Sequence, residues 1–283
     1  MSTEKQIQWY PGHMAKTKRL MKESLPLVDA VCEILDARIP VSCRNPDLSL
    51  LAANKPRIIL LNKSDLADPA VTAGFVAKFK EQGITAVEIN AKTKMGINRF
   101  FDTVNTVLAQ KIEQNRKKGI NKSLKLMVAG IPNVGKSTFI NSIADKKAKV
   151  EDRPGVTREN RWFAAQNNLM LMDTPGVLWL KFDDETVARR LAFTGAVKDT
   201  VLDTEEIAYY LIKELIELYP ELLCGRYGLN PADFEEPYDY LCAVGKKRGM
   251  LISGGEIDTV RTSNMLLDEF RGGVIGRISL DRI

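Results

Sequence analysis

A glycine-rich stretch followed by a lysine and a serine lies near the middle of this 283-residue chain, and its residue types suit the binding of phosphate groups. Gly130, Gly135, Lys136 and Ser137 satisfy the P-loop spacing G-x-x-x-x-G-K-[ST]. The glycines let backbone N–H groups turn inward around phosphate oxygens, the lysine can reach the β- and γ-phosphates, and the serine hydroxyl can ligate Mg²⁺. The apolar run at 124–129 and the helical spacing after the loop predict a strand and a helix on its two sides. This context favours a nucleotide site over a chance glycine turn.

A second motif has the residue types needed to recognise a base. Asn62, Lys63 and Asp65 form the pattern N-K-x-D directly after an apolar run at 57–61. The Asp65 carboxylate can accept hydrogen bonds from guanine N1–H and from the exocyclic amine, and adenine offers neither in that arrangement. The Lys63 stem can lie over the base, and Asn62 can tie neighbouring loops together. In a chain that also has a P-loop, this motif predicts selection of GTP over ATP.

A third polar group, Asn90-Ala91-Lys92, follows the apolar run at 84–89. We expect the Ala91 N–H to reach guanine O6. The alternative interpretation is an ordinary turn after a strand, because asparagine is common in turns.

Two further segments offer oxygen ligands for a metal and contacts for a γ-phosphate. Asp173 and Gly176 form the pattern D-x-x-G, in which the carboxylate can hold Mg²⁺ through water and the glycine N–H can meet the γ-phosphate. Thr157, in a loop at 153–157, is the best hydroxyl for closing on Mg²⁺ and the γ-phosphate; the alternative is a plain loop threonine. The expected Mg²⁺ set is therefore Ser137, Thr157 and Asp173.

These motifs all lie beside apolar runs of strand length. The carboxyl ends of parallel strands meet at one edge of an open sheet, where ligands bind, so we expect the motifs to converge there. The remaining predicted elements are a strand at 28–35, a hairpin of 161–165 and 169–172, helices at 71–82, 96–112 and 138–144, and a basic connector between 111 and 125. Strands alternating with helices predict an α/β fold with a mostly parallel sheet and helices on both faces.

From about residue 181 the pattern becomes helical. Amphipathic segments occupy 205–219, 238–244 and 255–271, and Pro220 is expected to end the first of them. The chain is thus predicted to have an N-terminal arm at 1–17, a nucleotide-binding domain at 18–180 and a small α-helical domain at 181–283. Basic residues of the helical domain could meet RNA phosphates, or could simply form a solvated face. They are Lys246, Lys247, Arg248, Arg261, Arg271 and Arg277.

Composition excludes several classes of protein. The net charge of +5 is a mild bias that is compatible with an anionic partner. The four cysteines show no C-x-x-C spacing and His13 is the only histidine, so a zinc site is not expected. Apolar runs are of strand length and the N-terminus lacks the apolar core of a secretory signal, so we expect neither a transmembrane helix nor export.

The order of the motifs is unusual. Ras-type GTPases have the P-loop first and N-K-x-D late, whereas here Asn62–Asp65 and Asn90–Lys92 precede the P-loop. The chain therefore resembles the circularly permuted GTPases, which implies a P-loop GTPase domain with circularly permuted motif order followed by the small α-helical domain. W-Y-P-G-H-M at 9–14, D-A-R-I-P at 36–40 and D-T-P-G at 173–176, with the P-loop, are similar to the YlqF/RbgA family of ribosome biogenesis GTPases along the whole chain.

Members of that family assist late assembly of the bacterial large ribosomal subunit. The resemblance implies GTP hydrolysis with Mg²⁺, slow alone and stimulated by the large (50S) subunit, binding to rRNA, and a cytoplasmic location; we also expect a monomer. The expected catalytic residues are His13, Lys136, Thr157 and Gly176. The expected GTP-binding residues are Asn62, Lys63, Ser64, Asp65, Asn90, Ala91, Asn133, Val134, Gly135, Lys136, Ser137, Thr138 and Gly176.

The chain departs from the Ras-type pattern at two positions. Val177 stands where a glutamine positions the attacking water, and an aliphatic residue cannot orient water. His13 could act there if its arm folds over the γ-phosphate; the alternative is that the aromatic cluster at 9–14 only anchors the arm. Asn90 stands where related G domains often have serine or threonine, which puts one supporting hydrogen bond in doubt.

Asn133 lies inside the P-loop. In GTPases that resemble this one, an asparagine there coordinates K⁺, which would offset charge developing between the β- and γ-phosphates. The alternative is an asparagine that bonds only to backbone. We therefore expect Mg²⁺ as a cofactor and K⁺ as a second.

Two other functions stay open on the sequence alone. The chain could be a nucleotide-gated binding protein for another target such as tRNA or membrane lipid, although it has no lipidation motif. It could instead be a P-loop kinase, but the N-K-x-D motif argues against this because a kinase need not read guanine.

Overall fold

The computed structural model describes the backbone of residues 11–145, 161–176, 178–179 and 184–283, with side chains from residue 18 onward. Contacts within the chain divide it into two compact units, one made mainly of residues 8–181 and the other mainly of residues 182–282. One unit holds the sheet and the other holds the C-terminal helices, and each is described by itself.

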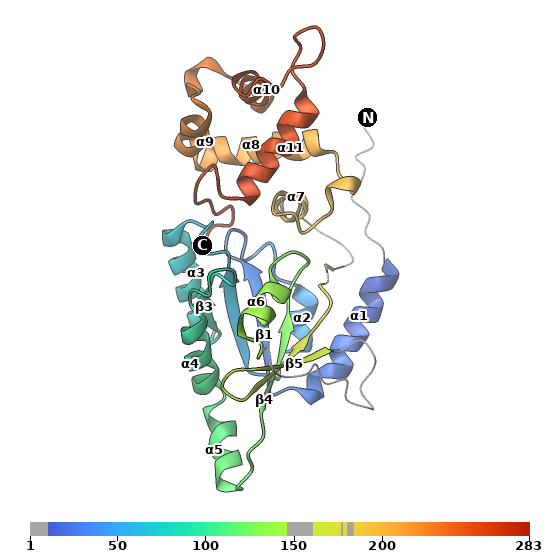
Figure 1. Cartoon of the computed structure of the whole chain (residues 1–283), viewed down its shortest axis with the longest axis vertical. Helices are drawn as coiled ribbons and strands as arrows, with labels where there is room; N and C mark the ends of the chain where they lie inside the picture. The colour runs from blue at the N-terminus through green and yellow to red at the C-terminus, as the bar shows by residue number, and fades with distance from the viewer. Residues whose placement is uncertain (1–10, 146–160, 177, 180–183) are drawn as a thin grey trace. The chain divides into compact units, whose positions relative to one another are not determined.

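The first unit is built on a six-stranded sheet with the order β3-β2-β1-β4-β6-β5 (Figure 1). Among the described strand pairs, only β5–β6 is antiparallel, so the expected mostly parallel sheet is confirmed. The chain runs outward from β1 to β3 on one side and then returns to place β4 on the other side of β1, so the order reverses between β1 and β4. Such a reversal opens a crevice at the carboxyl ends of the strands. The strands are β1 Ala30–Asp36, β2 Arg57–Asn62, β3 Thr85–Glu88, β4 Leu124–Ala129, β5 Arg161–Ala165 and β6 Leu169–Asp173.

Helices connect the strands and cover the sheet. In Figure 1, α6 lies in front of the sheet and α2 behind it. Asn45 and Asp68 cap α2 and α3, respectively, by accepting hydrogen bonds from free N–H groups of the first turn, and proline follows each of them at the first helical position. The helices of this unit are α1 Pro11–Ser24, α2 Pro46–Leu51, α3 Pro69–Glu81, α4 Ile97–Val107, α5 Ala109–Lys117 and α6 Lys136–Ile143.

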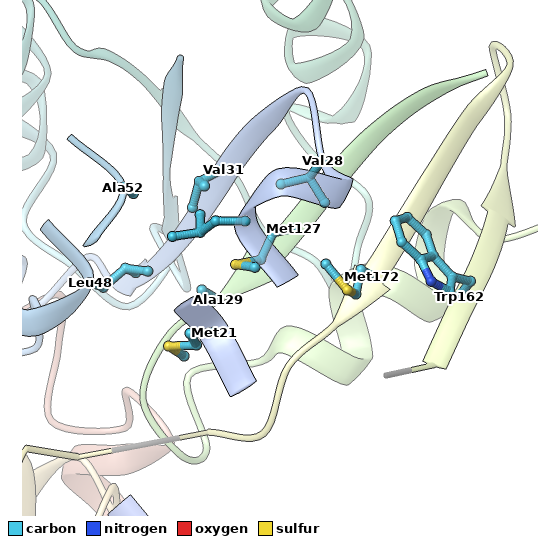
Figure 2. Packing of buried hydrophobic residues seen from close by; sticks show 10 residues of the cluster. Met21, Val28, Val31, Leu48, Ala52, Met127, Ala129, Trp162 and Met172 are labelled. Atoms are coloured by element: carbon cyan, nitrogen blue, oxygen red, sulfur yellow. The ribbon is translucent and has the colours of Figure 1, made fainter. Parts of the chain in front are cut away.

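The apolar core lies between the sheet and these helices. Figure 2 shows Met21 of α1 and Leu48 of α2 packed with Val31 and Met127, and Trp162 extends the cluster toward β5. Alternate residues of a strand face opposite sides, so this cluster accounts for only one face. Elsewhere in the unit, α4 and α6 pack through Phe100 and Phe139, whose rings meet edge to face with centroids 5.1 Å apart.

The single helix predicted at 96–112 is wrong. Leu108 separates α4 from α5, and α5 extends through Lys117, so the expected connector begins only after it. Glu113 explains why so basic a stretch can stay helical, because it pairs with Arg116 and Lys117 one turn away. The helix α1 was also not predicted as such, because charged and apolar side chains alternate there without a clear period.

In the described residues of the second unit, the regular elements are helices. Its helices are α7 Glu185–Phe193, α8 Thr204–Leu218, α9 Pro220–Tyr227, α10 Pro237–Lys247 and α11 Thr259–Arg271. Leu211, Leu241 and Phe270, from three of them, are buried together with other apolar residues. No described helix is long and apolar enough to span a bilayer.

One predicted helix boundary in this unit is wrong, and one helix was not predicted. The first amphipathic helix ends before Pro220, as predicted, but Pro220 also opens α9, which was not predicted and in which its missing N–H costs nothing. The last helix begins at Thr259 rather than at Gly255, because Gly254 and Gly255 adopt positive φ and Asp258 supplies the cap.

Candidate nucleotide-binding site

The loop between β4 and α6 is closed tightly by its two glycines. Gly130 has a φ of 152°, and a Cβ there would lie 2.5 Å from the Ile34 carbonyl oxygen. Gly135 has a φ of 102° and caps α6, and its Cβ would collide with the side-chain amide of Asn62. Both positions therefore require glycine. The loop leads into the N-terminus of α6, whose first-turn N–H groups have no partner within the helix and favour an anion.

Lys136 lies in this loop with its side chain turned back over it. Its residue is 8% exposed, and Nζ donates to the carbonyl oxygens of Gly130 at 3.0 Å and Ile131 at 2.8 Å. Burial lowers the pKa of Lys136 to about 8, although Asp173 acts in the opposite direction. The ammonium is therefore mainly charged at neutral pH and sits where it can meet phosphate oxygens.

A pocket with a volume of about 400 Å³ opens beside this lysine. It brings together five residues that the sequence predicts for the phosphates and metals: Asn133, Lys136, Ser137, Asp173 and Gly176. Gly176 approaches so closely that a Cβ would lie 2.7 Å from Lys136 Nζ. The whole lining is Pro132, Asn133, Lys136, Ser137, Arg161, Asp173, Thr174, Pro175 and Gly176.

Asn62 links this pocket to the expected base site. It is 4% exposed, and its amide Nδ2 donates to the Val134 carbonyl of the P-loop at 2.8 Å. Its Oδ1 accepts from the Ala91 N–H at 3.0 Å. Three segments far apart in sequence are thus joined by one side chain, as the sequence predicts for Asn62.

The segment at 90–92 forms a tight turn beside it. Asn90 Oδ1 accepts from the N–H groups of Lys92 at 2.9 Å and Thr93 at 3.0 Å, so asparagine supplies the side-chain acceptor that was in doubt. Ser64 donates to the Ile89 carbonyl at 3.0 Å and holds the turn against β2. The Ala91 N–H, which we expected to meet guanine O6, donates to Asn62 instead. An O6 contact would have to share this donor.

Comparisons with known proteins agree with this geometry. The chain is 48% identical over 280 residues to a protein named "Ribosome biogenesis GTPase A" from Priestia megaterium, covering 97% of this chain and 96% of that protein. The chain belongs to the ribosome biogenesis GTPase A family. A protein of the same name from Thermotoga maritima is 33% identical over 279 residues, covering 98% of this chain and 94% of that protein.

Two further comparisons support the fold. Residues 125–219 match the family described as "50S ribosome-binding GTPase". A solved structure titled as GNP-bound YlqF from T. maritima superposes with a TM-score of 0.65 at 26% identity, covering 94% of this chain and 98% of that one. The circularly permuted P-loop GTPase fold expected from the motif order is confirmed.

The pocket contains residues that could hold the Mg²⁺ expected from the sequence. Asp173 Oδ1 is buried and has no hydrogen-bond partner among the described residues, and Ser137, an exposed residue, lines the same pocket. Burial raises the pKa of Asp173, while Lys136 and Arg161 lower it. A carboxylate and a hydroxyl are oxygen ligands of the kind Mg²⁺ prefers. The described residues contain no cluster of three or more ionisable ligands, so phosphate and water oxygens would complete the shell.

The remaining predicted residues fall into two groups. Asp65 and Thr138 are exposed, Asp65 three residues beyond the end of β2 and Thr138 in the first turn of α6. The side chain of His13, and Thr157 and Val177 altogether, lie outside the described residues.

Arg161 is a pocket residue that sequence reasoning missed. It faces Asp173 in the antiparallel register of β5 and β6. The predicted hairpin around Asn167 and Asn168, both with positive φ, could have placed it there by counting back from the turn.

Proposed function

We propose that this chain binds and hydrolyses GTP in the site at the carboxyl edge of the sheet and uses the cycle to drive a late step in assembly of the large ribosomal subunit. The observation that carries the proposal is Asn62, which joins the P-loop to the N-K-x-D motif and to the turn at 90–92. Membership of the ribosome biogenesis GTPase A family, and the match to the family described as "50S ribosome-binding GTPase", support the cellular role.

Each residue of the site has a role in this account. Lys136 and the first-turn N–H groups of α6 neutralise the phosphates, and Gly176 meets the γ-phosphate. Ser137 and Asp173 would hold Mg²⁺, with Thr157 as the expected third ligand. Asp65 selects guanine, with Lys63 along the base. Asn133 would hold K⁺, which would supply positive charge to offset charge developing on the phosphates.

The attacking water needs a partner that the D-x-x-G segment lacks. Val177 cannot orient water, so hydrolysis by the free protein is slow. His13, in the first turn of α1, supplies the polar group when it reaches the γ-phosphate. The large subunit stimulates hydrolysis by stabilising that arrangement.

The helical unit carries the contact with the particle. Lys246, Lys247 and Arg261 are exposed and can meet rRNA phosphates. Arg271, expected in the same set, serves the fold instead, because it pairs with Asp199 through two contacts of 2.7 Å and donates to the carbonyls of Ala192 and Phe193. The segment from Asp173 to Gly176 leads directly in sequence toward this unit, so loss of the γ-phosphate can be transmitted to it. The protein acts as a cytoplasmic monomer.

The test is GTP hydrolysis by the pure protein in K⁺ buffer, with and without purified large ribosomal subunits. We expect the subunits to stimulate phosphate release by at least about tenfold, equivalent to about 1.4 kcal/mol of barrier. Free tRNA and small subunits serve as controls, and stimulation by tRNA instead would favour a different RNA target. Intact GTP binding without stimulation by any particle would contradict the ribosomal role.

A further inference from the structure

The segment 36–40 contains a buried acidic and a buried basic side chain to which the proposed function assigns no role. The side chains of Asp36 and Arg38 are 2% and 1% exposed. Arg38 donates to both oxygens of the Asp36 carboxylate, from Nε to Oδ1 at 2.9 Å and from Nη2 to Oδ2 at 2.8 Å. The Arg38 backbone N–H adds a third hydrogen bond at 3.1 Å. The carboxylate is therefore fixed in place by a residue two positions away.

Lys63 of the N-K-x-D motif contacts the same carboxylate. Its Nζ lies 3.0 Å from Asp36 Oδ2. The two strand ends are in register, with Asp36 opposite Asn62, and the Ala37 N–H donates to the Asn62 carbonyl at 2.9 Å. The contact therefore crosses from the end of β1 to the first residue after β2.

Lys63 has an uncommon backbone conformation for its residue type. Its φ is 58°, in the left-handed region, which a non-glycine residue enters at a cost and which points to surrounding contacts that hold it there. The Lys63 side chain is 25% exposed, against 2% and 1% for its two partners. Of the three side chains Asp36, Arg38 and Lys63, which we call the Asp36 cluster, only that of Lys63 is partly exposed, two residues before Asp65.

The charge state of the cluster is secure. Burial by itself would raise the pKa of Asp36, but Arg38 and Lys63 outweigh it and hold the pKa well below its usual range. Asp36 is consequently a permanent anion at neutral pH. Arg38 fixes the orientation of the Asp36 carboxylate, and the carboxylate attracts the Lys63 ammonium.

We propose that Asp36 is a positioning residue of the guanine site: it holds the Lys63 ammonium so that the aliphatic stem of Lys63 forms a fixed platform for the base. This inference rests on the proposed guanine-nucleotide site. A rigid platform spares the lysine its loss of rotamer freedom when the nucleotide binds, so fixing it in advance strengthens binding. The competing explanation is that the ion pair only holds β1 against β2.

A double-mutant cycle distinguishes these explanations. Dissociation constants for a fluorescent GDP analogue are measured for the wild type, Asp36→Asn, Lys63→Met and the double variant. We expect Asp36→Asn to weaken binding about tenfold in the wild-type background and less than about twofold when Lys63 is already Met, because interacting residues are not additive. The same loss in both backgrounds, or no loss in either, would overturn the proposal.

Two further variants protect the test. Asp36→Glu keeps the charge but moves the carboxylate by one methylene, and it is carried through the same cycle with the same expectation if Asp36→Asn does not fold. Glu33→Gln changes another buried acid of β1, and it should leave GDP binding within about twofold of the wild type. Wild-type affinity for GDP and ADP is measured alongside. Equal affinity for both would refute the guanine site itself, whereas GDP selectivity without coupling would refute only the role of Asp36.

Discussion

Two acid–base clusters lie on one strand, three residues apart, and they behave differently. Glu33 and Asp36 both belong to β1, are both buried, and each faces two cationic side chains. Because side chains alternate along a strand, the two acids point to opposite faces of the sheet. Asp36 lies at the end of the strand, beside the proposed guanine site, and Glu33 lies within the strand.

The clusters differ in how completely they are hydrogen-bonded. Among the described residues, Glu33 Oε1 and the Nε atoms of Arg44 and Arg57 have no hydrogen-bond partner, whereas both oxygens of Asp36 accept hydrogen bonds. Burial therefore dominates at Glu33 and raises its pKa, while the pKa of Asp36 is lowered. A buried charge is stabilised by its hydrogen bonds more than by the mere presence of an opposite charge. The complete cluster is the one that orients a functional lysine.

The largest expected effect is on the structural cluster. Glu33→Ala leaves Arg57, whose side chain is 11% exposed, without its acid, and should cost about 3 kcal/mol of unfolding free energy. GDP affinity should stay within about twofold of the wild type, because the site is at the other cluster. Urea unfolding and GDP titration measure the two quantities. A GDP affinity that fell in parallel with stability would break the distinction between the clusters.

The next effect is on Asn62, which lies in register with Asp36. Asn62→Ala removes the hydrogen bonds to Val134 and from Ala91 and should weaken GDP binding about 30-fold, from about 1 kcal/mol for each bond. Asn105→Ala, an exposed asparagine of α4, is the matched control and should change nothing. Equal affinities for the two variants would show that the three loops hold the nucleotide without this link.

A third prediction concerns pH and the phosphate half of the site. Phosphate oxygens favour the charged form of Lys136, so binding takes up a proton wherever the free lysine is neutral. Affinity for GTP should thus be constant below the pKa of about 8 and should fall as pH rises through it, by up to about tenfold for each further pH unit. Calorimetry in two buffers of different ionisation enthalpy measures the proton uptake. A flat affinity up to about pH 9.5 would contradict the lowered pKa of Lys136.

The smallest effect returns to the two acids. The raised pKa of Glu33 means that its ionisation removes stability as pH rises above 4.5, so the stability advantage of the wild type over Glu33→Gln should shrink there. The lowered pKa of Asp36 means that its contribution is present above pH 3.8 and is lost as pH falls below it, so the advantage over Asp36→Asn should shrink in acid. Unfolding free energies are measured in urea between about pH 3 and 7 for the wild type and each variant. The difference from the wild type should change with pH in opposite directions for the two acids, by on the order of 1 kcal/mol in total. Slopes of the same sign would mean that the clusters are electrostatically alike.

The sequence predicts most of the sheet and the nucleotide motifs because both depend on local patterns. Buried parallel strands are continuous apolar runs, and each motif follows such a run, so residue order alone assigns Asn62 and Lys136 to one edge of a sheet. The turn at Asn167 and Asn168 is likewise predictable from residue type.

Other features depend on contacts that no local pattern records. The pairing of Asp36 with Lys63 arises from strand register, and the burial of Arg38 contradicts the ordinary expectation for arginine. Pro220 marks the end of α8 in the sequence, but the same signal does not reveal that α9 begins at this residue. The use of the Ala91 N–H by Asn62 also depends on two loops meeting in space.

The measurement that tests the account most directly is the base preference of Asp65→Asn. Asparagine can still accept from N1–H, but its amide donates where the carboxylate accepted, and this suits the C2 carbonyl of xanthine instead of the amine of guanine. Dissociation constants for GDP and xanthosine diphosphate are compared for the wild type and the variant. We predict that the wild type prefers GDP and that the variant prefers the xanthine nucleotide by at least about tenfold. A variant that keeps its preference for GDP would show that Asp65 does not read the base and would contradict the proposed site.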